Sequence, residues 1–416
     1  MNKLSLDSVL LFALVIPFIM GYRIGPGETP FLLFGFIFLL LLGNVLLDLF
    51  YERNKIYALL KNTILWVTIF TVIGSSFVSA IIVRHQTAPV YMIHDIILQQ
   101  EAAMRFLLDG KNPYQETYFG TPLQDWHYGD TEVNPALYHF VMEPFYLLFA
   151  IPFYLLSNIF FGFFDARVPL LFLFFLLLVI SWRVVDDQDK RRLFVILLAF
   201  HPSLLPYTLE GRSDIFMFTF LFAGWLFLLW KRNFLAGVSI GLAAAVKQSA
   251  WPFIPFYILY LFFRKKSLRN TAVALLPFVA TFSLVTLPFL LWNPKAFLDS
   301  TVFYLSGNTE NSYPISGYGF GSILLQLGTI KDKFVSYPFL LWQVLICIPL
   351  FVVLIKYLKK HTNVKTLIIV YAVFLLVYWY FSRYFNNSHI AFISYMLIAA
   401  YFWPSSEAKN DTQSSL

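Results

Sequence analysis

Long apolar segments recur along almost the whole chain and restrict its fold more than any other feature. The chain is 59% hydrophobic and 13% charged, whereas a soluble domain carries about 25% charged residues. A helix that crosses the hydrocarbon core of a bilayer needs about 20 mostly apolar residues. The sequence therefore predicts an all-α, polytopic integral membrane protein with about 12 transmembrane helices, at Leu4–Tyr22, Phe31–Phe50, Thr63–Val83, Val168–Val185, Leu193–Leu209, Ile215–Trp230, Phe234–Val246, Trp251–Phe263, Thr271–Trp292, Tyr337–Tyr357, Thr366–Phe381 and Ile390–Trp403.

A polar segment from about Arg84 to Asn134 interrupts these apolar segments. It contains the pair His94-Asp95, then an amphipathic helix, then a turn at residues 110–114. A polar segment of this length adds nothing to solvation by lipid, so it predicts a function on the aqueous side. We expect a membrane enzyme with its catalytic carboxylate in the first large external loop.

The amphipathic helix of this loop is predicted from helical spacing. Its apolar stripe consists of Ile93, Ile96, Ile97, Met104, Leu107 and Leu108. The other side carries Gln99, Gln100, Glu101 and Arg105, with Glu101 and Arg105 at the i,i+4 spacing of a favourable ion pair. Gly110 and Pro113 are typical of a helix end. Such a helix is expected to lie flat in the interface with its apolar face toward the lipid.

Residues 135–164 resist a simple assignment, because Pro144 and Pro152 divide a stretch long enough for one span. Cytoplasmic loops of membrane proteins concentrate Lys and Arg. If the stretch crosses the membrane zero or two times, 19 of the 30 basic residues but only 8 of the 23 acidic residues become cytoplasmic. We therefore predict a re-entrant or interfacial hairpin on the external side and two cytoplasmic termini.

The predicted organisation is a single transmembrane domain of residues 1–404. Its large external loop, with re-entrant or juxtamembrane helices, spans residues 84–164, and residues 405–416 are expected to form a disordered cytoplasmic tail. Three further polar clusters share the external face: residues 210–214, 293–333 and 382–389. We expect a site built from these clusters at the outer boundary between lipid and water.

Two aspartates of the external clusters are candidates for acid–base chemistry. Asp95 stands where the amphipathic helix begins, so it serves as an N-cap, as a general base, or as both. A helix N-terminus favours the ionised carboxylate. Asp214 either caps the next span or provides a second carboxylate facing Asp95, and Arg212 adds a cation two residues before it.

Cations that could hold an anionic ligand are also present. Lys247 follows the small-residue run 237–246, a composition that allows close helix packing. Its side chain either extends to the interface or points into a cavity and holds a phosphate. A further external set lies near the C-terminus, where loop polarity alone is the competing explanation: Arg383, Asn386, Asn387 and His389.

Metal and cofactor signatures are weak in this sequence. The histidines do not follow a zinc-ligand spacing, and there is no P-loop or GxGxxG motif. The single cysteine, Cys347, excludes an internal disulfide and a thiolate cluster. No cofactor is predicted, and a divalent metal ion is left open. The net charge of +7 fits cytoplasmic Lys and Arg better than nucleic-acid binding.

The order of several motifs resembles the GT-C superfamily of membrane glycosyltransferases. The resemblance covers about residues 63–290, with a weaker similarity to residue 403. His94-Asp95 follows a transmembrane helix, as in that superfamily. The other matching segments are EAAMRFLLDGKNPY (Glu101–Tyr114), NPALYHFVMEP, DARVPLL (Asp165–Leu171), GRSDIFMF and GVSIGLAAAVKQSAWPFIP.

This resemblance implies an inverting transferase. It is most similar to mannosyltransferases that use polyprenol-phosphate-mannose, with a glycan or lipid acceptor and the active site on the external face of a prokaryotic plasma membrane. Asp95 is then the catalytic base, and Lys247, Arg212 and Arg383 are candidates for the donor phosphate. Supporting or acceptor-binding roles fall to His94, Glu101, Tyr114, His127, Asp214, Asn386 and His389. The chain departs from some members in lacking a clear Asp-x-Asp motif and a large soluble C-terminal domain, which leaves metal dependence open.

Other functions also fit a polytopic chain of this size. A transporter or flippase for lipid-linked sugars agrees with about 12 spans, although inverted repeats are not evident. A lipid-linked polysaccharide ligase or polymerase also uses a large external loop. Release of polyprenyl phosphate from a labelled lipid-sugar discriminates transfer from transport.

Overall fold

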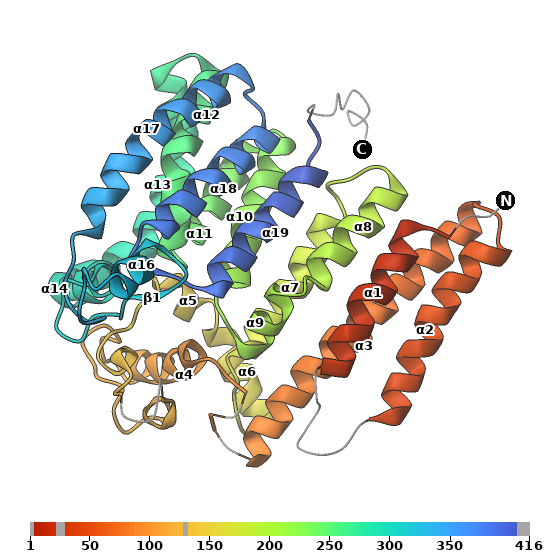
Figure 1. Ribbon diagram of the computed structural model, residues 1–416, viewed down its shortest axis with the longest axis horizontal. Coiled ribbons are helices and arrows are strands. Elements are labelled where there is room, and N and C mark those ends of the chain that lie inside the picture. The colour runs from red at the N-terminus through yellow and green to blue at the C-terminus, as the bar shows by residue number, and fades with distance from the viewer. Residues whose placement is uncertain (1–3, 22–29, 88, 91, 128–131, 406–416) are drawn as a thin grey trace. The chain divides into compact units, whose positions relative to one another are not determined.

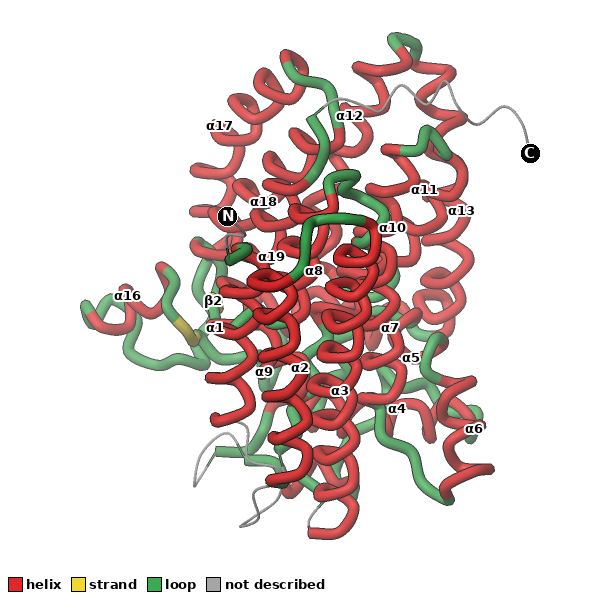
Figure 2. Tube along the Cα trace, turned by 90° about the vertical axis from the view of Figure 1, so that its right-hand side faces the viewer, coloured by secondary structure: helices red, strands yellow, loops and turns green. Residues whose placement is uncertain are grey.

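The computed structural model describes residues 4–21, 30–87, 89–90, 92–127 and 132–405, and its regular structure is almost entirely helical (Figure 1, Figure 2). Contacts divide the chain into two compact units, each assembled from two stretches of sequence. Unit 1 comprises Met1–Leu98 and Phe153–Ser213, and unit 2 comprises Gln99–Pro152 and Asp214–Leu416. The tail predicted to be disordered lies, from residue 406 onward, outside the described residues.

Unit 1 is built from helices, which are α1 (Leu6–Gly21), α2 (Phe31–Phe50), α3 (Lys55–Thr87), most of α6 (Ile151–Phe161), α7 (Arg167–Ser181), α8 (Gln188–Ala199) and α9 (Leu204–Glu210). Helix α4 (Asp95–Leu108) begins in unit 1 and continues in unit 2. Within unit 1, α3 packs against α2, α7 and α8, so the long helix α3 connects the other elements of this unit.

Unit 2 contains the remaining helices: α5 (Phe145–Leu148), α10 (Asp214–Leu229), α11 (Asn233–Ala244), α12 (Ile254–Lys265), α13 (Leu268–Trp292), α14 (Pro294–Leu298), α15 (Tyr304–Ser306), α16 (Phe320–Gln326), α17 (Phe339–Lys360), α18 (Val364–Tyr380) and α19 (Asn387–Phe402). Short helical turns are η1 (Pro122–Asp125), η2 (Pro135–Leu137), η3 (Gln248–Phe253) and η4 (Asp299–Phe303). The short strands β1 (Ser316–Gly317) and β2 (Tyr384–Phe385) pair in parallel, with Ser316 opposite Tyr384.

Every segment predicted to span the membrane is largely helical. This agreement is expected, because both the length of an apolar segment and its tendency to form a helix depend on residues close together in the sequence. Among the described residues, four helices are long and apolar enough to cross a bilayer: α2, α3, α13 and α17. The bent pair α8 and α9 gives a fifth span if it is counted as one. The other apolar helices are shorter, so the prediction of about 12 spans is not confirmed.

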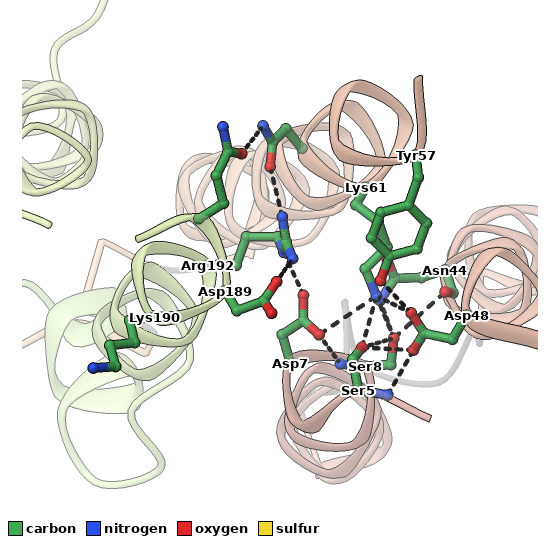
Figure 3. Close-up of polar contacts among 12 residues, drawn as sticks. Ser5, Asp7, Ser8, Asn44, Asp48, Tyr57, Lys61, Asp189, Lys190 and Arg192 are labelled. Carbon is green, nitrogen blue, oxygen red and sulfur yellow. Dashed lines mark hydrogen bonds and ion pairs between the residues drawn. The ribbon is translucent and has the colours of Figure 1, made fainter. Parts of the chain in front are cut away.

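A buried ion network joins four helices of unit 1 (Figure 3). The ammonium of Lys61 on α3 lies 3.1 Å from Asp48 on α2 and 3.5 Å from Asp7 on α1. Arg192 on α8 pairs with Asp7 in turn. Buried charges are costly unless paired, and here each side chain contacts one of opposite sign. The network therefore fixes α1 and α2 to the rest of unit 1.

Close helix packing in unit 2 follows from small residues, as the composition of 237–246 predicts. Helix α11 packs against both α10 and α13. A Cβ on Gly224 would lie 2.6 Å from the Ile240 side chain, and one on Gly241 would lie 3.0 Å from the Phe278 carbonyl oxygen. These helices can approach so closely only because the glycines have no side chain.

The segment of residues 135–164 contains two short helices, α5 and α6, which are interrupted at residues 149–150 and together form one apolar stretch, Phe145–Phe161. Pro144 directly precedes the single turn α5, and Pro152 lies in the first turn of α6. These pieces are each 11 residues or shorter. The external placement of this hairpin stays a prediction.

The orientation predicted for α4 is wrong in one respect. Its glutamines and Glu101 are buried, whereas the amphipathic pattern placed them on the exposed side. The Gln99 amide donates to the carbonyl oxygens of Ala136 and His139, and the Gln100 amide donates to that of Tyr146. The polar side of α4 therefore packs against the backbone of residues 135–146, because those carbonyl groups accept from its amide N–H groups. Among the described residues, the side-chain oxygens of Gln99 and Gln100 are buried without a hydrogen-bond partner.

Candidate functional site

The His94–Asp95 pair stands at the beginning of α4. Asp95 is the first helical residue, and its Oδ1 lies 2.6 Å from His94 Nδ1. Its side chain is 9% exposed, whereas that of His94 is 24% exposed. The first turn of a helix favours a negative charge. The arrangement places a carboxylate in the first turn of a helix, and the imidazole beside it is the more accessible of the two groups.

The end of α9 holds this pair from one side. The backbone N–H of His94 donates to the Glu210 carbonyl oxygen over 2.7 Å. Gly211 ends α9 in the left-handed region with φ of +100°, and a Cβ there would lie 2.2 Å from Ile97 of α4. Only glycine fits both the backbone conformation and the close approach. Arg212 follows, 3.4 Å from Glu210 and with its guanidinium over the Tyr207 ring.

Asp214 and Lys247 form an ion pair in unit 2. Lys247 Nζ lies 2.6 Å from Asp214 Oδ1. Asp214 begins α10, whereas Lys247 lies in an extended connection between α11 and η3. The Asp214 side chain is 6% exposed and that of Lys247 is 20% exposed. A buried carboxylate thus pairs with a lysine whose side chain stays partly exposed.

Gln248 connects three segments beside Lys247. Its amide donates to the carbonyl oxygens of Val141 and Thr301 and to the Glu143 carboxyl. The backbone N–H of Glu143 also donates to the Val246 carbonyl oxygen. The segment around Glu143 is therefore joined to residues 246–248 through both its backbone and its side chain. Glu143 is fully buried, and burial raises its pKa to about 8. Sequence reasoning missed Glu143, although a lone acidic residue in an apolar stretch was a usable signal.

Arg383, a predicted phosphate ligand, is buried and directed at the backbone. Its guanidinium donates to the carbonyl oxygens of Tyr313, Val335 and Lys333. Burial lowers its pKa to about 10. These contacts hold the segment of residues 313–335, and the predicted role of Arg383 in donor binding stays a prediction.

Asn386 and His389 act together at the start of α19. The Asn386 side chain accepts from the N3 backbone, while His389 Nδ1 accepts from the Asn386 backbone N–H, so the two residues form a capping box. Asn386 also contacts Ser316 and Tyr313. Both residues therefore help to fix the start of α19, and Asn386 also links it to residues 313–316. Their predicted acceptor-binding role stays a prediction.

Three further predicted residues belong to neither of the two ion pairs. Tyr114 is buried and donates to the Met142 carbonyl oxygen, and burial raises its pKa well above the ordinary value. Glu101 is buried on α4. His127 is exposed beside residues outside the described part. None of these three placements tests the predicted roles.

Within the described part of the chain, no group of three or more His, Cys, Asp and Glu side chains could hold a metal ion. The predicted charged residues are described within their own units. Unit 1 carries His94–Asp95 and Arg212, and unit 2 carries Asp214–Lys247. Chemically, the first group offers a proton acceptor and the second offers a cation for an anionic ligand.

Comparison with known proteins gives one match. The family model of glycosyltransferase family 87 matches residues 140–402, which is more than half of the chain. No curated protein and no solved structure matches significantly.

Proposed function

Because the chain belongs to glycosyltransferase family 87, a family of membrane glycosyltransferases of the GT-C type, we propose that it transfers a monosaccharide from a polyprenyl-phosphate donor with inversion. The acceptor is a hydroxyl of a glycan or a lipid, and mannose is the first sugar to test. The reaction takes place at the external face of a prokaryotic plasma membrane. Apolar helices long enough to span a bilayer support a membrane location.

The proposed step moves one proton and one electron pair. The acceptor oxygen forms a bond to the anomeric carbon while the bond from that carbon to the phosphate oxygen breaks. The bonding electrons leave with polyprenyl phosphate, and the hydroxyl proton passes to Asp95. The transition state has oxocarbenium character, as in glycoside cleavage, with the acceptor in place of water.

The single observation that carries this proposal is the His94–Asp95 pair. Asp95 lies in the first turn of α4, where the helix dipole favours the carboxylate, and His94 Nδ1 lies 2.6 Å from it. A base must be ionised before it accepts a proton, and the position of Asp95 in the first turn of α4 favours that form. The imidazole of His94 is held beside it, because its Nδ1 also accepts from the backbone N–H of Ile96.

Polyprenyl phosphate needs positive charge rather than a strong acid as it leaves. Lys247 is the proposed ligand, because its ammonium pairs with Asp214 and its side chain is still one-fifth exposed. Arg212 is the second candidate, with 25% of its side chain exposed. The proposal does not use Arg383, whose donors face backbone carbonyl groups.

The test is transfer by purified protein in nanodiscs. Radiolabelled polyprenyl-phosphate mannose and other polyprenyl-phosphate sugars are offered with candidate acceptors, and released polyprenyl phosphate and product mass are measured. We expect Asp95→Asn to lower turnover about 10²–10⁴-fold, the usual contribution of general-base catalysis, while the protein stays folded. The amide keeps the size of the side chain and its contact with His94.

The matched control is Asp109→Asn, an exposed aspartate just beyond the same helix, which is expected to keep full turnover. Near-wild-type turnover of Asp95→Asn would show that the base lies elsewhere. Uptake of the lipid-sugar into vesicles without release of polyprenyl phosphate would favour a flippase instead.

A further inference from the structure

Three charged side chains are buried together in unit 1: Arg84, Asp165 and Arg167. Asp165 Oδ2 lies 2.8 Å from both Arg84 Nη1 and Arg167 Nη2, and its Oδ1 lies 2.9 Å from Arg167 Nε. Burial alone would raise the pKa of Asp165. The two guanidinium groups, with Arg167 contributing most, more than offset this and hold that pKa well below its usual range. The triad is therefore charged and tightly hydrogen-bonded.

The outer donors of this triad hold the segment that leads into His94–Asp95. Arg84 Nε donates to the Pro89 carbonyl oxygen over 2.7 Å, and Arg167 Nη1 donates to the Met92 carbonyl oxygen over 3.3 Å. Arg167 also lies within 3.5 Å of the Leu209 carbonyl oxygen at the end of α9. The buried triad thus contacts the segment that precedes His94 and also the end of α9, whose Glu210 accepts the hydrogen bond from His94.

The backbone of this segment is strained at Met92. Its φ of +44° lies in the left-handed region, which side chains other than glycine adopt at a cost. Such a conformation persists only where the surroundings determine it, and strained residues concentrate at functional sites. The guanidinium of Arg167 on the Met92 carbonyl group is a contact that holds it here.

We propose that the Arg84–Asp165–Arg167 triad positions the His94–Asp95 pair for catalysis. The triad does not touch the substrate in this account. It fixes the backbone at Pro89 and Met92 and the end of α9, and the hydrogen bond from His94 to Glu210 links that backbone to the residue beside the carboxylate. The inference rests on the proposed function, in which Asp95 is the base.

The test compares two buried carboxylates of unit 1 that differ in what they hold. Asp165→Asn weakens the triad, whereas Asp48→Asn weakens the ion network of Lys61 shown in Figure 3. Both side chains are 0% exposed and both pair with a buried cation. Each variant is assayed for thermal midpoint, for kcat and for donor KM in the same nanodiscs.

We expect Asp165→Asn to lower kcat about 10²-fold, the scale of a misplaced catalytic group, with donor KM within about threefold of wild type. Asp48→Asn is expected to lose comparable thermal stability and to keep kcat. If kcat of the two variants falls equally, or if Asp165→Asn keeps wild-type kcat, the triad is a structural element only and the proposal is overturned.

A milder variant covers the case in which Asp165→Asn does not fold. Arg84→Lys keeps a positive charge, but a single ammonium cannot reproduce the two directions of the guanidinium toward Asp165 and Pro89. Its kcat is expected to fall at least tenfold, and wild-type kcat would contradict the proposal. Asp95→Asn is measured alongside. If that variant keeps turnover, the proposed function itself fails, a result separate from failure of the triad variants alone.

Discussion

Replacement of Glu143 by glutamine is expected to change how the stability of the protein depends on pH. Glu143 is fully buried, and its Oε1 accepts from the Gln248 amide. Within the described part of the chain, its Oε2 has no hydrogen-bond partner. A buried carboxylate with one unsatisfied oxygen favours the protonated form. Desolvation accordingly raises its pKa from 4.5 to about 8, and the bond from Gln248 opposes this only in part.

The sign of the effect follows from the number of bound protons. Between the pKa of 4.5 in the unfolded chain and about 8 in the folded chain, the folded state holds one proton more. The stabilising contribution of protonation is fully present below pH 4.5 and is lost as the pH rises through 8. The slope is about 1.4 kcal/mol per pH unit, so about 2 to 3 kcal/mol disappears between pH 6 and pH 9.

The substituted amide cannot ionise, and its oxygen can still accept from Gln248. We therefore expect Glu143→Gln and wild type to unfold at similar temperatures near pH 6, and the variant to become progressively the more stable of the two toward pH 9. Thermal scans in nanodiscs at a fixed heating rate measure this, because membrane proteins of this size often unfold irreversibly and only matched scans compare.

An exposed carboxyl provides the control for this experiment. Glu310→Gln removes an acidic group whose side chain is open to solvent, so its midpoint is expected to follow wild type at every pH. Parallel pH curves for wild type and Glu143→Gln would refute the reasoning, because they would mean that Glu143 releases its proton at the same pH in both states.

Substitutions at Lys247, Gly211 and Arg383 give the remaining predictions. Lys247→Met is expected to raise donor KM about 10- to 100-fold, the value of a hydrogen bond to a charged group. Adding Asp214→Asn should restore thermal stability but not KM, because the buried carboxylate is no longer left unpaired; an unchanged KM in the single variant would exclude the lysine. Gly211→Ala should cost more than about 1 kcal/mol because of its positive φ, and an unchanged thermal midpoint would contradict this. Arg383→Met should make residues 307–336 sensitive to protease at constant donor KM, and a raised KM would assign that arginine to the donor.

Local features of the structure could be predicted from the sequence because they depend on near neighbours. The apolar segments are helices, and Gly110 follows α4 with φ of +76°, as a helix-ending glycine does. The small residues of α11 permit close contact with α13. The number of spans could not be predicted in the same way. Several apolar helices have 17 residues or fewer, and length alone does not decide whether such a helix crosses the membrane.

The orientation of α4 shows where periodicity fails. A helical pattern distinguishes polar from apolar positions, and it assumes that polar groups face water. Gln99 and Gln100 instead satisfy carbonyl groups of residues 136–146, which are distant in sequence. The energetic reason is that the buried N–H donors of both amides find acceptors, which lowers the cost of burying them. No local pattern contains that information.

The partners that each charged side chain contacts decide which role it can have, and the sequence does not show those partners. Asp214 was predicted as a cap or a second carboxylate, and Lys247 as an interfacial or phosphate-binding cation. The two side chains are 2.6 Å apart, so each sets the environment of the other. Arg383 differs from Lys247, because its guanidinium donates to three backbone carbonyl oxygens rather than to a carboxylate. A cation is available to a phosphate only where its partner leaves part of it exposed, which favours Lys247 over Arg383 although the sequence presented them alike.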